Sequence, residues 1–202
     1  YEVKPGGAVV AHYHGTLKSD GTVFDSSFQR GEPVAFPLSG VIQGWQKGVP
    51  GMKIGGIRRL TIPAKLAYGE SSPGPGIPAN ADLVFIIQLI DALQIEDIPV
   101  GEGEEVGLAA VSVTAYTMKG ADGKVIESAT KEKPYIWIPR EHNGVSSGLE
   151  GMKVGGKRKI TIPAQFNQSN PQLSPTRPSN VPIVVEVELL ALRNLPGPGG
   201  RR

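Results

Sequence analysis

The sequence predicts a protein of the α+β class, in which an antiparallel sheet is covered by one short helix and the whole arrangement occurs twice. Most periodic segments are rich in β-branched and aromatic residues, which favour strands, and one segment of the first half has helical spacing. The block Gly48–Ala64 also returns almost unchanged as Gly148–Ala164, which indicates an internal duplication. The helix is then expected to cover the apolar face of its sheet.

The duplication involves three blocks that occur in the same order in both halves. SDGTVFDS at Ser19–Ser26 returns as ADGKVIES at Ala121–Ser128, EPVAF from Glu32 returns as KPYIW from Lys133, and GVPGMKIGGIRRLTIPA returns as GLEGMKVGGKRKITIPA. Because the spacing slips by single residues between blocks, a whole domain has been copied rather than a short solenoid repeat. We expect a first domain at residues 1–93, a second domain at 94–195 and a flexible tail at 196–202.

Several segments of the first half have patterns typical of strands, and one has the pattern of a helix. AVVAHYHGTL predicts a strand, and the glycine of SDGT predicts a hairpin turn after it. SGVIQGWQKGV predicts a short helix that Ser39 caps, with Val41, Ile42 and Trp45 spaced to share a face. RRLTIPA alternates between apolar and polar residues and ADLVFIIQLIDAL is a long apolar run, so both predict strands.

The second half repeats most of this pattern. AAVSVTAYTM, RKITIPA and VPIVVEVELLAL predict strands, and the glycine of ADGK predicts a hairpin. The glycines of MKIGG and MKVGG predict a sharp turn between helix and strand, with backbone angles that other residues avoid. The basic segment KVGGKRK is expected to be exposed.

Composition excludes several classes of function. A formal charge of +2 is too small to indicate a nucleic-acid surface, and no apolar run approaches the roughly 20 residues of a membrane span. The absence of cysteine excludes disulfides, thiolate nucleophiles and cysteine-ligated zinc. We expect no cofactor and no metal site, with His12 and His14 in structural roles.

Three stretches of the first half together resemble the FKBP-type peptidyl-prolyl cis-trans isomerases, which also bind macrolides such as rapamycin. They are VVAHYHGTLKSDGTVFDSSFQRGEP, VIQGWQKGVPGMKIGGIRRLTIPAKLAYG and GIPANADLVFIIQLI, and the resemblance covers nearly all of residues 1–93. It departs at the front, where most of the family's first strand is missing before KPGGAVV. The resemblance implies two FKBP-like domains, each a half-open antiparallel sheet curled around one short helix.

The resemblance also implies an apolar pocket that holds an X–Pro peptide bond. The catalytic residues implied are Tyr13, Asp25 and Tyr68. The substrate-binding residues implied are Phe24, Arg30, Phe36, Val41, Ile42, Trp45, Ile77 and Phe85. Taken singly, the aromatic residues fit an ordinary core and Asp25 fits an ordinary turn, but their joint order favours the site.

Each implied residue has a physical role. Rotation about an X–Pro bond crosses a barrier of about 20 kcal/mol, and the twisted transition state is less polar than the planar amide. A dry pocket with Trp45 as its floor therefore suits this reaction, which needs no nucleophile. The resemblance further implies that the Ile42 N–H and the Tyr68 hydroxyl hold substrate carbonyls, while Asp25, near Tyr13 and Arg30, supplies an oriented polar edge.

The second domain is predicted to be a degenerate, catalytically silent copy. Tyr13 is replaced by Ala115, Phe24 by Ile126, Asp25 by Glu127, Trp45 by Val145, Tyr68 by Gln168 and Phe85 by Val185, while Trp137 matches Phe36. The flap becomes NQSNPQLSPTRPSNV. A smaller floor and the loss of two hydroxyl groups would leave the polar groups of a ligand unpaired.

Together these inferences predict a peptidyl-prolyl isomerase that assists protein folding through its first domain. Its partners would be proline-containing polypeptides, macrolides as inhibitors and a protein partner for the second domain, with no nucleic acid. The alternative is that both domains are non-catalytic binding modules of a larger assembly. The default localisation is soluble and cytoplasmic, and an exported or organellar form stays open because the sequence opens at Tyr1 without methionine.

Overall fold

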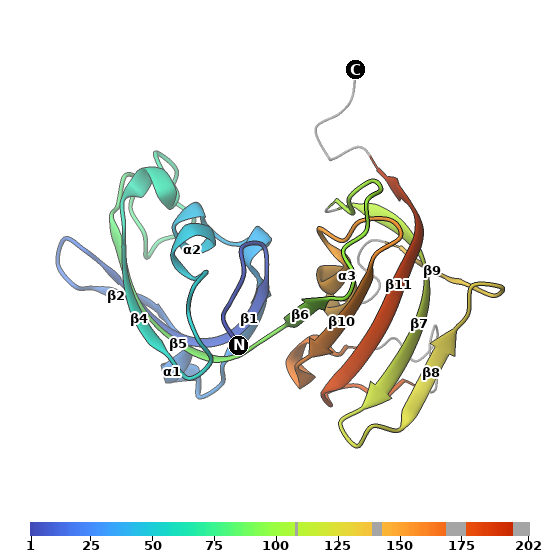
Figure 1. Ribbon diagram of the computed structural model, residues 1–202. Helices are drawn as coiled ribbons and strands as arrows, with labels where there is room; N and C mark the ends of the chain where they lie inside the picture. The colour runs from blue at the N-terminus through green and yellow to red at the C-terminus, as the bar shows by residue number, and fades with distance from the viewer. Residues whose placement is uncertain (108, 139–142, 169–176, 196–202) are drawn as a thin grey trace. The chain divides into compact units, whose positions relative to one another are not determined.

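The computed structural model describes residues 1–107, 109–138, 143–168 and 177–195 of the chain. The chain divides into two compact units, Tyr1–Ala92 and Leu93–Arg202, which are called unit 1 and unit 2 below (Figure 1). Each unit is built from an antiparallel sheet and short helices, so the predicted α+β class is confirmed. The flexible tail predicted at 196–202 lies outside the described residues.

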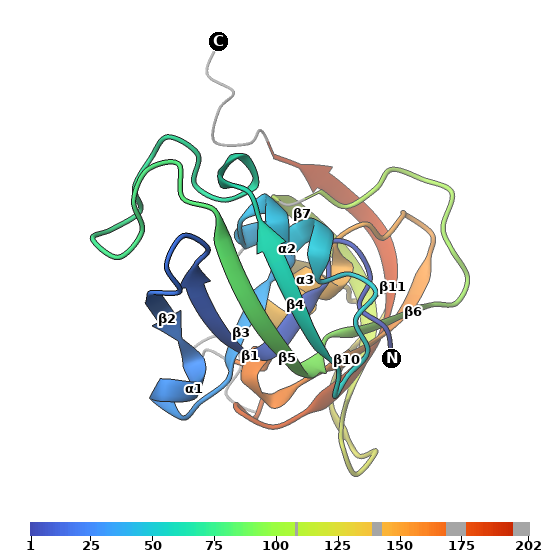
Figure 2. The same cartoon turned by 90° about the vertical axis from the view of Figure 1, so that its left-hand side faces the viewer.

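Unit 1 contains a five-stranded sheet whose central strands, β1 (Ala8–Leu17) and β5 (Leu83–Ala92), pair with each other. The strands β2 (Val23–Ser26) and β3 (Val34–Pro37) pair with β1, and β4 (Ile57–Ile62) pairs with β5. The helical elements are α1 (Ser27–Arg30), η1 (Leu38–Gly40), α2 (Gln43–Gly48) and η2 (Ala64–Leu66). Figure 2 shows β1, β5 and β4 running side by side.

Unit 2 contains a six-stranded sheet in the order β6, β10, β11, β7 and β8, with β9 also paired to β7. Its strands are β6 (Gln94–Asp97), β7 (Ala110–Gly120), β8 (Val125–Ala129), β9 (Tyr135–Trp137), β10 (Lys157–Ile162) and β11 (Ile183–Asn194). Its helical elements are α3 (Asn143–Leu149) and η3 (Ala164–Phe166). The strand pairs within both sheets are antiparallel.

Two glycines bring α2 into direct contact with β4. A Cβ at Gly44 would lie 2.4 Å from Ile62, and a Cβ at Gly48 would lie 2.7 Å from Leu60. Positions four apart lie on the same helix face, so together the two glycines form a flat surface for the strand. Gly144 and Gly148 of α3 make the same close approach to β10, so helix and strand pack in the same way in both units.

The turn after each helix also requires glycine. Gly55 has a φ of +85° and Gly155 a φ of +83°, a region that residues with a Cβ rarely adopt. The sharp turn predicted from MKIGG and MKVGG is therefore present in both units.

The helix of unit 1 begins later than the sequence predicts. Ile42, rather than Ser39, is the residue that precedes its first turn, and its carbonyl accepts hydrogen bonds from the Trp45 and Gln46 N–H groups at 2.9 and 3.2 Å. Ser39 lies in the separate 3-10 turn η1. Val41 and Ile42 are therefore loop residues that lead into α2, not members of its apolar face.

The sheet of unit 2 has one more strand at its edge than the sheet of unit 1. β6 lies beyond β10, whereas among the described residues β4, the equivalent of β10, is the edge strand of unit 1. β6 pairs with β10, and Asp97 at its end accepts hydrogen bonds from Arg158 Nε at 2.5 Å and Nη2 at 3.2 Å. Arg58 and Arg158 each donate to two or more carbonyl groups of the helix–strand turn. The conserved geometry of these two arginines shows that they tie the turn to the sheet.

Candidate functional site

Unit 1 contains an open cavity of about 690 Å³ between its sheet and α2. Every predicted site residue except Arg30 lines it: Tyr13, Phe24, Asp25, Phe36, Val41, Ile42, Trp45, Tyr68, Ile77 and Phe85. These residues come from β1, β2, β3, β5, α2 and the loops beside them. The fold therefore brings together residues that lie more than 70 positions apart in the chain.

Trp45 lies at the bottom of the cavity and contacts three other aromatic rings. Its ring centroid is 5.2 Å from those of Phe36 and Phe85 and 5.7 Å from that of Tyr13, all in edge-to-face geometry. Phe24 packs edge-on against Phe85 at 5.5 Å. Edge-to-face contacts fix the orientation of each ring. Because Trp45 is only 4% exposed, the cavity has a rigid apolar floor.

A hydrogen-bonded group of three side chains forms the polar edge of the cavity. The Tyr13 hydroxyl and the Arg30 guanidinium both donate to the Asp25 carboxylate. Arg30 Nη2 also donates to the Tyr13 hydroxyl at 2.9 Å, and its guanidinium carbon lies 5.7 Å from the centroid of the tyrosine ring. Arg30 thus holds the site from outside and does not line the cavity.

This arrangement keeps Asp25 ionised. Partial burial alone would raise the pKa of Asp25, but the hydrogen bonds from Tyr13 and Arg30 and the positive charge of Arg30 lower it overall. Burial and the hydrogen bond to Asp25 raise the pKa of Tyr13, so its hydroxyl remains a donor. The edge therefore presents a fixed carboxylate and a fixed hydroxyl at neutral pH.

Two further groups at the cavity are available for a ligand. Among the described residues, none accepts a hydrogen bond from the Ile42 N–H, while the Ile42 carbonyl is used by the first turn of α2. Tyr68 lines the cavity with 40% of its surface exposed. Both groups are hydrogen-bond donors at an otherwise apolar wall, which suits them to bind carbonyl oxygens.

The cavity also has lining residues that the sequence analysis did not single out. They are Val34, Gly40, Pro73, Gly74, Pro75 and Gly76. Four of them belong to the stretch SSPGPGIP, whose alternating proline and glycine already indicate an irregular loop of restricted shape. Ser72 secures this loop because its hydroxyl donates to the carbonyls of Gly74 and Ile77 at 2.9 and 2.7 Å.

The register of unit 2 corrects one predicted equivalence. Gly15 lies opposite Asp25 in unit 1, and Met118 lies opposite Glu127 in unit 2. Counting back two residues places Tyr116, not Ala115, at the position of Tyr13.

The side chains support the corrected register. The Tyr116 hydroxyl donates to the Glu127 carboxylate as Tyr13 donates to Asp25. Burial and this hydrogen bond raise the pKa of Tyr116. The prediction that unit 2 loses this hydroxyl is therefore wrong, although the hydroxyl is committed to Glu127.

The hollow beside α3 in unit 2 is very small. Its volume is about 10 Å³, and it is lined by Val145, Phe166, Gln168 and Arg177 among others. Val145 occupies the position of Trp45, and Trp137 is 1% exposed at the position of Phe36. This hollow is far smaller than the cavity of about 690 Å³ in unit 1.

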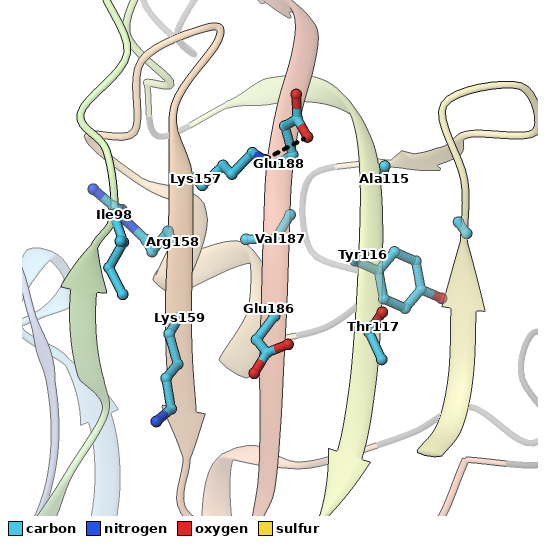
Figure 3. Close-up of a pocket in the computed structure, with 11 residues that line it drawn as sticks. Ile98, Ala115, Tyr116, Thr117, Lys157, Arg158, Lys159, Glu186, Val187 and Glu188 are labelled. Atoms are coloured by element: carbon cyan, nitrogen blue, oxygen red, sulfur yellow. Dashed lines mark ion pairs between the residues drawn. The ribbon is translucent and has the colours of Figure 1, made fainter.

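A separate hollow of about 370 Å³ lies on the sheet of unit 2, where β10, β11 and β7 run side by side (Figure 3). Its rim is charged, and Glu188 pairs with Lys157 at 3.6 Å and with Lys131 at 2.6 Å. Arg158 beside it is only 7% exposed, so the expectation that all of KVGGKRK is exposed is wrong at this residue. A polar, self-paired surface of this kind does not offer the dry environment that an X–Pro bond needs.

The two histidines of β1 make hydrogen bonds to serine. His12 Nδ1 lies 3.1 Å from the Ser27 hydroxyl, and His14 Nδ1 lies 3.2 Å from the Ser26 hydroxyl. The described part of the chain contains no group of three or more histidine, aspartate or glutamate residues that could hold a metal ion. Among the same residues, no helix combines the length and apolar character needed to cross a bilayer.

Comparison with known proteins gives the family. The model of the FKBP-type peptidyl-prolyl cis-trans isomerase family matches residues 1–90 and, a second time, residues 103–190. FK506-binding protein 2 of Debaryomyces hansenii is 54% identical over 90 residues, which are 44% of this chain and 65% of that protein. Peptidyl-prolyl cis-trans isomerase FPR2 of Saccharomyces cerevisiae is 53% identical over 89 residues, which are 43% of this chain and 66% of that protein. The matched part thus spans just under two thirds of each relative.

Among solved structures, that of the 3 FKBP domains of wheat FKBP73 is 24% identical, with a TM-score of 0.43 over 96% of this chain and 90% of that one. The family match covers most of both units. The chain therefore belongs to the FKBP-type peptidyl-prolyl cis-trans isomerase family, and it carries two domains of that family in tandem.

Proposed function

We propose that this chain is a peptidyl-prolyl cis-trans isomerase whose active site is the cavity of unit 1, within a domain at residues 1–93. The second domain, at 94–195, is non-catalytic. The observation that carries this proposal is the cavity itself, in which a floor of aromatic rings meets the polar edge formed by Tyr13 and Asp25. Its substrates are proline-containing polypeptides, and macrolides compete for the same space.

The mechanism follows from the change in polarity during rotation. A planar X–Pro amide is stabilised by resonance, and this stabilisation is lost when the bond twists. Trp45 and Phe85 supply an apolar surface for the proline ring and exclude water, which favours the less polar twisted state. Tyr68 and the Ile42 N–H bind carbonyl oxygens of the peptide, so the chain on one side of the bond is held while the other side turns.

Asp25 acts at the edge of this pocket. Its carboxylate is fixed by Tyr13 and Arg30 and needs no reorganisation when the substrate twists. No covalent intermediate is required, since bond rotation needs only differential binding of the twisted state. The relatives named after FK506 and after isomerase activity support this assignment for the same family.

The proposal is tested on the full chain with a short peptide that has leucine before proline. We expect the chain to catalyse cis-to-trans exchange. In a folded double variant, Asp25→Asn with Tyr68→Phe, we expect the catalysed rate to fall at least tenfold. Asp20→Asn, an exposed change in the neighbouring hairpin, is the matched control and should leave the rate unchanged. An unaltered rate in the folded double variant would remove the site from unit 1 and favour a non-catalytic binding role.

A further inference from the structure

Arg177 of unit 2 occupies the position that Ile77 has in unit 1. Each is followed directly by proline, and three residues later by an asparagine with a φ of 57°, Asn80 in unit 1 and Asn180 in unit 2. Both asparagines lie just before the last strand of their unit in chain order, β5 in unit 1 and β11 in unit 2. The loops therefore enter the two sheets in the same way, and they differ in the side chain that they direct toward the interior.

The two side chains have different effects on the space beneath the loop. Ile77 is short, 9% exposed, and leaves the cavity of about 690 Å³ open. Arg177 is longer, and its side chain is only 2% exposed. Its Nη2 donates to both oxygens of Glu127 at 3.1 and 3.0 Å, and its guanidinium carbon lies 5.3 Å from the centroid of the Trp137 ring.

The carboxylate that receives Arg177 corresponds to the one at the edge of the unit 1 site. In unit 1, Asp25 is bound by Arg30, whose side chain is 49% exposed and approaches from α1 on the outside. In unit 2, Glu127 is bound by an arginine that is buried in the interior. The ion pair is thus present in both units, but its cation comes from α1 in unit 1 and from the segment before β11 in unit 2.

Little space remains beside Arg177. The hollow beside Arg177 measures about 10 Å³, and a cavity needs at least about 10–15 Å³ to hold a single water molecule. A proline ring has no room there unless the arginine leaves. Withdrawal of Arg177 would also break its ion pair with the partly buried carboxylate of Glu127, whose side chain is 21% exposed.

We propose that Arg177 is the residue that excludes proline-containing and macrolide ligands from unit 2, because its side chain occupies the ligand space and is held there by Glu127 and Trp137. This inference rests on the proposed function, since it takes the cavity of unit 1 as the ligand site. Missing groups alone do not account for a lack of ligand binding in unit 2. The carboxylate, the tyrosine hydroxyl and a large aromatic ring are all retained there.

Trp137 provides a direct test because the chain contains only one other tryptophan. In the full chain with Trp45→Phe, Trp137 emission reports unit 2 alone. With Arg177 in place, we expect no response to a leucine–proline tetrapeptide at millimolar concentration and weak quenching by acrylamide. With Arg177→Ile, we expect at least a twofold larger quenching constant and a saturable emission change with the peptide.

Arg193→Ile is the matched control, because Arg193 is exposed on β11 and the chemical change is the same. It should behave like the parent in both measurements. A folded Arg177→Ile chain with unchanged quenching and no peptide response would overturn the proposal. If that variant does not fold, the Trp45→Phe chain with Arg177 decides: a saturable peptide response there overturns the proposal, and its absence supports it.

This test is independent of the activity of unit 1. The isomerase rate of the unaltered chain measures the proposed function, whereas Trp137 emission measures access to unit 2. An inactive chain in which Arg177→Ile opens unit 2 would refute the proposed function and keep the role of Arg177. An active chain in which Arg177→Ile changes neither quenching nor the peptide response would support the proposed function and refute the role of Arg177.

Discussion

Gly15 of β1 and Met118 of β7 occupy equivalent positions, and they give the interiors of the two units different shapes. Gly15 lies opposite Phe85 and Met118 lies opposite Val185 in the register of their sheets. A Cβ at Gly15 would lie 2.6 Å from the ring of Phe24, so the absence of a side chain allows the two phenylalanine rings to meet. Met118 is fully buried and fills the corresponding space in unit 2.

The first prediction concerns this glycine. Gly15→Ala should destabilise unit 1 by about 1–3 kcal/mol, the usual cost of overpacking a filled interior, because Phe24 has to move. It should also weaken macrolide binding, since Phe24 is a wall of the cavity. Urea unfolding followed by circular dichroism and a binding titration measure the two effects. Ser19→Ala in the exposed hairpin is the control, and equal stability of the two variants would contradict this account.

The second prediction concerns Trp45, which belongs both to the core and to the candidate site. Trp45→Ala should cost roughly 3–5 kcal/mol of unfolding free energy, the range for truncation of a buried aromatic residue. Phe28→Ala should cost less than about 1 kcal/mol, because Phe28 is 46% exposed and stacks on His12 at the surface. Equal losses for the two variants in urea titrations would show that Trp45 is not a core residue.

The sequence predicts much of the fold because its signals are local. Strand periodicity, hairpin glycines and the glycine-rich turn after the helix depend on neighbouring residues, and each is present in the structure. The grouping of aromatic residues and Asp25 around Trp45 could be inferred only from the resemblance to a family. The fold places those residues around one cavity, and their roles remain predictions.

The predictions from the sequence fail where the equivalence of two positions depends on a one-residue difference in spacing. Gly15 and Asp25 lie in register, as do Met118 and Glu127, but the second hairpin is one residue shorter. A constant offset therefore assigns Ala115 to the position of Tyr13, and in a strand a slip of one residue moves the side chain to the other face. Likewise, no local pattern indicates that Arg177 is buried, because its partner Glu127 lies far away in the chain.

The third prediction concerns pH. The pKa of Asp25 is lowered in the folded state, so its contribution is complete above the ordinary aspartate value of about 3.9 and is lost as the pH falls through the lower, folded value. The isomerase rate should therefore be flat from pH 7 to about pH 4 and fall only below it. A kcat/KM profile with an uncharged peptide measures this. An inflection above pH 5 that disappears in Asp25→Asn would contradict the lowered pKa.

The fourth prediction concerns the strand that unit 2 has beyond β10. Asp97→Ala should destabilise the protein by roughly 1–3 kcal/mol, because Arg158 is buried and loses a charged acceptor while it keeps its carbonyl acceptors. Asp122→Ala removes an exposed partner of Lys124 and should change stability by less than about 1 kcal/mol. Thermal unfolding compares the two. If Asp97→Ala is as mild as Asp122→Ala, the ion pair does not hold β6 in place.

The last prediction distinguishes the contribution that the Arg177–Glu127 ion pair makes to stability from the contribution of side-chain packing. Glu127→Leu should cost about 3–5 kcal/mol, because it leaves a buried guanidinium without its carboxylate. Adding Arg177→Ile to it should recover much of that loss, since the remaining side chains are apolar and the uncompensated charge is gone. The four unfolding free energies of this double-mutant cycle give the coupling between the two residues. Additive effects would show that Arg177 and Glu127 act independently, and the arginine would then be held in the interior by Trp137 and its other neighbours rather than by the carboxylate.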